Sequence, residues 1–207
     1  MSVVDLCYTF SMLPEKIIFV GVFLSLIGQI LYIRSIIYGT TRPNLVSWFI
    51  WMLAPFIAVF FQLKAGAGLS VVPVFMTGFG PLLVIIVSIF NKNAYWKISQ
   101  FDMICGALAV IALVLYVFTH NLEISIIFAI LSDGLAAVPT LVKSWQFPET
   151  EVGYGYFAAF ISNILGLLVI KDWSFTIYSF GVYNVIINAS ILFCIYHQKI
   201  LKNKIIA

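Results

Sequence analysis

Long apolar runs, separated by short polar or helix-breaking stretches, form the dominant pattern of this chain. A helix needs about 20 mostly apolar residues to cross a bilayer. Seven runs approach that length, at 17–38, 44–63, 68–90, 100–119, 122–145, 152–170 and 174–196. The stretches between them, such as TTRPN, KAGAG and QFPETE, are short. The pattern predicts an all-α membrane protein in which residues 1–207 form one integral membrane domain of seven helices.

Composition strengthens this prediction. Hydrophobic residues make up 63% of the chain and charged residues 9%, and the mean hydropathy is +1.10, whereas soluble domains carry roughly a quarter charged residues. The lipid bilayer is therefore the expected surrounding. The net charge of +3 is spread over short loops, which argues against a nucleic-acid partner. The three cysteines and two histidines are scattered without ligand spacing, so we expect no metal and no cofactor.

The basic residues predict the orientation in the membrane, because Lys and Arg concentrate on the cytoplasmic side. With the N-terminus outside, the outer side carries three of them: Lys16, Lys64 and Lys171. The inner side then carries eight: Arg34, Arg42, Lys92, Lys97, Lys143, Lys199, Lys202 and Lys204. We therefore expect an outside N-terminus and a cytoplasmic C-terminus, in a cytoplasmic membrane of the bacterial type.

An internal repeat relates the two halves of the chain. Placing Gly28 over Gly134 gives an offset of 134 − 28 = 106 residues. Aromatic residues then coincide on the second segment of each half, Trp48 over Tyr154 and Trp51 over Phe157. Residues 17–90 and 122–196 each form a three-segment repeat, and segment 100–119 is a connector that restores parallel orientation. The expected architecture is a 3+1+3 bundle with parallel repeats, a build found among transporters.

The second repeat contains a motif-like stretch. Pro139-Thr140-Leu-Val-Lys143-Ser-Trp145, followed by Glu149-Thr150-Glu151, resembles the motif of the PQ-loop and SWEET-like (MtN3-type) membrane proteins. In that family a Pro-Gln pair near the cytoplasmic end of the first helix of each repeat precedes a basic and a Ser/Thr-Glu stretch. Here Thr140 replaces the Gln, and Ile33-Arg34 stands at the equivalent place in the first repeat, with Arg42 where the basic residue is expected. The chain is thus similar to a divergent member of that superfamily.

The build is also similar to that of Pnu-type vitamin transporters. Their W-x-x-W motif lies on the sixth helix, whereas here Trp48 and Trp51 lie on the second. What the resemblance implies is alternating access, in which two three-helix units rock around a central site. It also implies hinges at prolines on the first two helices of a repeat, here Pro139 and Pro55.

The second segment offers the first candidate binding surface. Asn44, Trp48, Trp51 and Pro55 fall at i, i+4, i+7 and i+11, so they share one helix face. The two indoles fit either an interfacial aromatic belt or a stacking surface for a sugar or heteroaromatic ring. Under the second interpretation, Tyr154 and Phe157 would face the tryptophans across the repeat axis.

Asp133 is the most informative single residue. It lies near the middle of segment 122–145, where a charged side chain costs at least about 2.5–3.5 kcal/mol to insert. It fits a proton or cation coupling site, a hydrogen-bond acceptor for substrate, or a structural group paired with Gln29. Asn163 and Asn184 are further candidates on the last two segments. In SWEET-like relatives a central Asn on the last helix of a repeat contacts substrate, and Asn184 resembles it by depth. Interhelical hydrogen bonding is the alternative role for both.

These features predict a membrane transporter for a small polar solute such as a sugar, a nucleoside or a vitamin-like molecule. No HExxH motif and no Gly-rich phosphate loop is present, so we do not expect an enzyme. The rival hypothesis is a non-transporting PQ-loop-like receptor or assembly factor. Two repeats can enclose one pathway in a single chain, so a homo-oligomer is compatible with the sequence but not required. The substrate, and whether transport is facilitated or proton-coupled, stay open.

Overall fold

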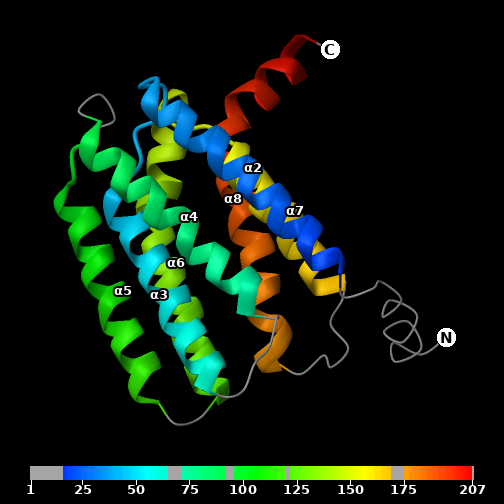
Figure 1. The fold of residues 1–207 in the computed structure, drawn as a ribbon. Helices are drawn as coiled ribbons and strands as arrows, with labels where there is room; N and C mark the ends of the chain where they lie inside the picture. The colour runs from blue at the N-terminus through cyan, green and yellow to red at the C-terminus, as the bar shows by residue number, and fades with distance from the viewer. Residues whose placement is uncertain (1–15, 65–70, 92–95, 120–121, 169–174, 207) are drawn as a thin grey trace.

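The computed structural model of the protein describes residues 16–64, 71–91, 96–119, 122–168 and 175–206. All regular secondary structure in these ranges is helical, which confirms the all-α prediction for them (Figure 1). The elements are α2 (Ile17–Ile37), α3 (Leu45–Lys64), α4 (Val71–Phe90), α5 (Gln100–Phe118), α6 (Leu122–Gln146), the 3₁₀ turn η2 (Pro148–Thr150), α7 (Tyr154–Leu168) and α8 (Phe175–Ile206).

Within the described ranges, four helices are long and apolar enough to cross a bilayer. They are the stretches Ile17–Ile37, Gln100–Phe118, Glu123–Gln146 and Tyr178–Gln198. Shorter apolar helical stretches occupy Leu45–Ile57, Phe75–Phe90 and Tyr154–Leu168. Large side chains such as Phe23, Ile30 and Ile104 lie exposed on the outside of the bundle. That is the distribution expected of a protein surrounded by lipid, because hydrocarbon replaces water as the solvent of the outer surface.

Helix α8 is longer than the membrane segment predicted at 174–196. Its apolar span is Tyr178–Gln198, and the helix continues to Ile206 and projects beyond the bundle (Figure 1). Its final stretch, HQKILKNKII, contains neither Gly nor Pro and is rich in residues that tolerate a helix. Within the predicted segment 152–170, the structure describes α7 over 15 residues, Tyr154–Leu168. The predicted end at 170 lies outside the described ranges.

Local chemistry explains where α2 ends and α5 begins. Gly39 adopts a left-handed backbone with φ of 71°, and the Tyr38 and Gly39 amides donate to the carbonyls of Arg34 and Ile36. This is a glycine-type helix end. At α5, the Ser99 side chain caps the Asp102 amide while the Asp102 carboxylate accepts from the Ser99 amide, a reciprocal capping box. Both features lie at the end of the bundle that carries residues 38–44 and 147–153.

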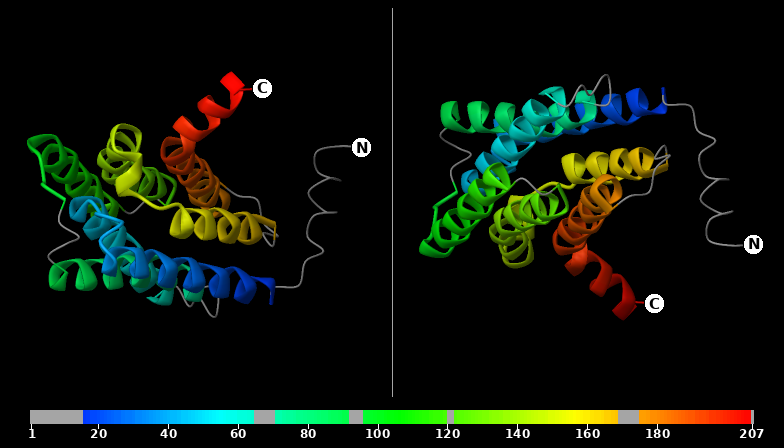
Figure 2. Two further views of the ribbon diagram at one scale, coloured as in Figure 1. Left: turned by 90° about the horizontal axis from the view of Figure 1, so that it is seen from above. Right: turned by 90° about the horizontal axis from the view of Figure 1, so that it is seen from below.

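The helices form two triplets with the same internal contacts. In the first triplet, α4 packs on both α2 and α3; in the second, α8 packs on both α6 and α7. Between triplets, α2 runs beside α7 over much of its length, and α3 packs against α6, as both views of Figure 2 show for α2 and α7. Helix α5 packs mainly on α6 and also on α3. Each triplet therefore presents its first helix to the second helix of the other.

Individual contacts give the register between the triplets. Tyr32 of α2 lies against Gly155 of α7, where an added Cβ would be 3.6 Å from Tyr32 Cβ. Thr140 of α6 donates to Ser47 of α3 at 2.9 Å. These contacts are equivalent at an offset of 108 residues (140 − 32 = 155 − 47 = 108). The structural register thus differs by two residues from the 106 inferred from the glycines.

Candidate functional site

Four aromatic rings meet where the two triplets face each other. Tyr32 of α2, Trp48 and Trp51 of α3, and Tyr156 of α7 form what we call the aromatic cluster. Ring centroids are 4.9 Å apart for Tyr32–Trp48 and 5.4 Å for Trp48–Trp51. Tyr156 lies 5.9 Å from Tyr32, 6.3 Å from Trp48 and 6.5 Å from Trp51. The cluster joins both halves of the bundle, because three rings come from the first triplet and one from the second.

The aromatic cluster contains buried donors that are not used. Trp48 and Tyr156 are 5% and 4% exposed. Among the described residues, neither Trp48 Nε1 nor the Tyr156 hydroxyl has a hydrogen-bond partner. A buried donor without an acceptor costs about 1–3 kcal/mol, and such groups in a native structure point to a binding function or a bound water. Trp51 is only half-buried, so one ring of the cluster keeps an accessible surface.

Asp133 adjoins this cluster through Trp51. The Trp51 indole donates to the Asp133 backbone carbonyl at 3.4 Å. The Asp133 carboxylate is 7% exposed, and its Oδ2 accepts from the Tyr183 hydroxyl of α8 at 2.7 Å. Gln29 was weighed as the partner of Asp133, but it donates instead to the Gly80 carbonyl of α4 at 3.1 Å. Asp133 is thus held at the interface by the Tyr183 phenol and the Trp51 indole, both of which are uncharged.

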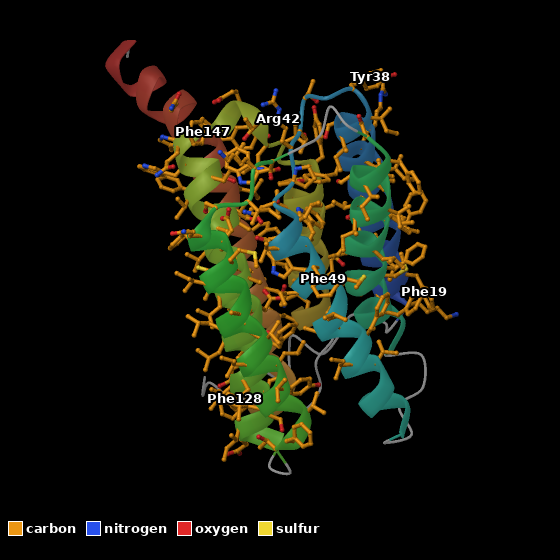
Figure 3. The ribbon with its side chains drawn as sticks, turned by 90° about the vertical axis from the view of Figure 1, so that its left-hand side faces the viewer. Phe19, Tyr38, Arg42, Phe49, Phe128 and Phe147 are labelled. Atoms are coloured by element: carbon orange, nitrogen blue, oxygen red, sulfur yellow. The ribbon has the colours of Figure 1, made fainter. Side chains whose placement is uncertain are left out.

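A set of polar residues, separate from the aromatic cluster, joins the two triplets at the end of the bundle near residues 38–44 and 147–153. Lys143 of α6 and Glu151 form a fully buried salt bridge of 2.6 Å. Glu151 also accepts from Tyr32 at 2.9 Å, and Lys143 donates to the Arg42 carbonyl. The Arg42 amide donates to the Thr150 carbonyl at 3.0 Å. We call these five residues the polar network; Figure 3 shows Arg42 at the same end of the bundle as Phe147.

The polar network is satisfied at each charged atom that it buries. Both carboxylate oxygens of Glu151 accept a hydrogen bond, and the Lys143 ammonium also lies 5.1 Å from the Trp96 ring centroid. The two charges come from one triplet, whereas Tyr32 and Arg42 belong to the other. Tyr32 takes part in both sites, with its ring in the aromatic cluster and its hydroxyl in the network.

The candidate residues at the start of α3 and within it all face the interior of the bundle, but they make different contacts. Asn44 is fully buried and donates to Asp102 of α5 at 3.0 Å, while its Oδ1 accepts from the Val46 amide at 3.1 Å. It therefore caps α3 and fastens it to α5. Trp48 and Trp51 enter the aromatic cluster. Pro55 is buried within a helix that continues past it, as is Pro139 in α6.

The expectation for Tyr154 and Phe157 is wrong. Their side chains are 53% and 58% exposed and lie outside the aromatic cluster. The two-residue difference in register explains this error, because two residues on a helix turn the side chain by roughly 200°. Tyr156 takes the inward place. Tyr154 and Phe157 instead line an outward apolar groove of about 470 Å³ between α2, α7 and α8.

The two candidate asparagines of α7 and α8, Asn163 and Asn184, donate hydrogen bonds within their own helices. The Asn163 side chain donates to the Ala159 carbonyl at 2.8 Å and that of Asn184 to the Phe180 carbonyl at 3.0 Å. Within the described ranges, neither side chain has a hydrogen bond to the aromatic cluster. Thr140 is fully buried and bonds Ser47 across the triplet interface. Arg34 is exposed at the end of α2, with its guanidinium 5.5 Å from the Tyr38 ring centroid.

Sequence reasoning missed four residues at these sites: Tyr32, Glu151, Tyr156 and Tyr183. It also counted Lys143 among the loop charges, although Lys143 is buried. One signal was present, because Lys143 and Glu151 carry opposite charges on either side of the break QFP. Comparison with family models, curated proteins and solved structures finds no match for this chain.

Proposed function

We propose that this protein is a membrane transporter for a small polar solute, working by alternating access between the triplets α2–α4 and α6–α8, with α5 as connector. The seven helices would all cross the membrane in a 3+1+3 arrangement. Reciprocal packing of first and second helices between the triplets supports this proposal, because a shared contact pattern allows one unit to rock against the other. Pro55 and Pro139 are the proposed hinges.

One observation carries the proposal: two buried donors at the interface between the triplets, Trp48 Nε1 and the Tyr156 hydroxyl, have no hydrogen-bond partner among the residues that the structure describes. A solute that enters there supplies the missing acceptors and stacks on the accessible face of Trp51. The site belongs to both triplets, so a bound solute contacts both moving parts. That is the arrangement alternating access requires.

The proposed orientation places the N-terminus outside and the C-terminus in the cytoplasm of a bacterial-type membrane. Removing the buried Lys143 from the count leaves seven basic residues on the inner side against three outside (8 − 1 = 7). The asymmetry still favours this orientation. The polar network then lies at the cytoplasmic end of the bundle.

Uptake into proteoliposomes tests the proposal, using a panel of sugars, nucleosides, vitamins and amino acids. We expect flux of at least one class, and we expect Trp51→Ala to reduce it by roughly tenfold or more, because a stacking surface of the site is lost. Phe157→Ala is the matched control, since it truncates an exposed aromatic side chain on the outer face of α7.

Two outcomes would contradict the proposal. Equal loss in both variants would show that Trp51 acts only on folding. Absence of flux for the whole panel, together with stoichiometric binding of a partner protein, would favour a PQ-loop-like receptor or assembly factor instead.

A further inference from the structure

Among the described residues, Asp133 differs from the other buried charged groups in the partners that stabilise its charge. These groups are three carboxylates, Asp102, Asp133 and Glu151, and one ammonium, Lys143. Lys143 neutralises Glu151 directly. Asp102 accepts from the Ser99 amide and hydroxyl at 2.7 and 2.9 Å and from Asn44 at 3.0 Å. The Asp133 carboxylate accepts from the neutral Tyr183, and the other donor beside it, the Trp51 indole, is also uncharged. The charge of Asp133 has no counter-ion among the described residues.

The surroundings of Asp133 favour a cation. A carboxylate within a membrane bundle is normally paired with a cation or a proton. Trp51 donates to the Asp133 backbone carbonyl and belongs to the aromatic cluster of four rings. Aromatic faces attract cations most strongly where water is excluded. The described basic side chains other than Lys143, namely Lys16, Arg34, Arg42 and Lys97, are all exposed. An anionic solute would meet Asp133 with no basic group beside it.

We infer that the solute carries a positive charge that pairs with the Asp133 carboxylate while its apolar body lies against Trp51. This rests on the proposed function and narrows it from polar solutes in general to organic cations. The unpaired donors at Trp48 and Tyr156 then take hydrogen-bond acceptors elsewhere on the same solute. The buried negative charge and the aromatic surface together select against anions by repulsion and against aliphatic neutral solutes by the lack of a partner for Asp133.

The test uses probes that share one body and differ in charge. Tryptamine, tryptophol and indole-3-acetate form one set; phenethylamine, 2-phenylethanol and phenylacetate form a second. Binding to the purified protein is measured by thermal shift and by calorimetry. For the wild type we expect each amine to bind at least about tenfold more tightly than its alcohol, and the acid to bind most weakly.

Asp133→Asn keeps the size and the acceptor for Tyr183 but removes the charge. We expect it to abolish the preference for the amine, lowering amine affinity by about tenfold or more while alcohol affinity changes by less than about threefold. Asp102→Asn is the matched control, because it removes a buried carboxylate at the N-terminus of α5 that lies outside the proposed site. It should leave the ratio of amine to alcohol affinity unchanged.

The inference is overturned if amines and alcohols bind the wild type equally, or if Asp133→Asn leaves the amine preference intact. Its failure is separable from failure of the transport proposal. Flux of neutral solutes that is insensitive to Asp133→Asn would leave transport standing without the cation site. Asp133-dependent binding of amines without any flux would leave the cation site standing without transport.

Discussion

The polar network and the aromatic cluster adjoin each other through one residue, Tyr32, yet they treat buried polar groups in opposite ways. In the network, Glu151 uses both carboxylate oxygens and Lys143 bonds both Glu151 and the Arg42 carbonyl. In the cluster, Trp48 Nε1 and the Tyr156 hydroxyl have no partner among the described residues. Satisfied buried groups hold a structure together, whereas unsatisfied ones weaken it unless a ligand completes them. This contrast supports a structural role for the polar network, and it fits the proposed binding role of the aromatic cluster.

The largest expected effect comes from breaking the ion pair in the polar network. Lys143→Met leaves the Glu151 carboxylate buried without its cation, and removing one partner of such a pair costs about 3–5 kcal/mol. The free energy of unfolding in detergent micelles measures this loss.

The double variant Lys143→Met with Glu151→Met is the control, since replacing both charges by apolar groups is often close to neutral. It should recover most of the stability. A double variant as unstable as the single one would show that Lys143 acts through packing and not through charge.

A smaller loss is expected from Tyr32→Phe, which keeps the ring in the aromatic cluster and removes the hydroxyl from the network. A hydrogen bond to a charged acceptor contributes about 1.5–3 kcal/mol, so unfolding should become easier by that amount. Amide hydrogen exchange should also quicken at residues 40–44 and 150–153, where the bonds between the triplets lie. Unchanged amide exchange at both stretches would show that the Tyr32 hydroxyl does not help to hold the triplets together at this end of the bundle.

The smallest effect on stability is expected from Tyr156→Phe, the same chemical change on a ring 5.9 Å away. Its hydroxyl is buried without a hydrogen-bond partner in the described part of the chain, so stability should stay unchanged or rise by up to about 1 kcal/mol. Affinity for the solute should nevertheless fall roughly two- to tenfold through the lost hydrogen bond. A clear loss of stability in this variant would mean that the cluster is as structural as the network.

The sequence predicts features within a single helix better than it predicts contacts between helices, and the reasons are physical. Apolar length predicts helices well, and helical spacing alone places Asn44 and Trp48 on one face, although it does not say which way that face turns. Asp133 was also predictable as an interface residue, because lipid excludes an unpaired carboxylate. In each case the signal lies within a single helix.

Partners across the interface were not predictable in this way. Tyr32 and Glu151 are 119 residues apart, and no local pattern relates them. The register between the triplets failed for a different reason. The offset of 106 came from a single glycine pair, Gly28 and Gly134, whereas contacts across the interface give an offset of 108 for the first and for the second helices of the triplets. Because the predicted offset was two residues too small, the prediction named Tyr154 and Phe157, which face outward, and missed Tyr156, which faces inward.

The position of the salt bridge has a consequence for any opening of this end of the bundle. Lys143 and Glu151 both belong to the second triplet, and the groups of the first triplet that they bond across the interface, the Arg42 carbonyl and the Tyr32 hydroxyl, are neutral. Separating the triplets therefore leaves the two charges together as one neutral dipole on the departing half. Neither an isolated ammonium nor an isolated carboxylate has to be solvated during the movement, so its electrostatic cost stays small.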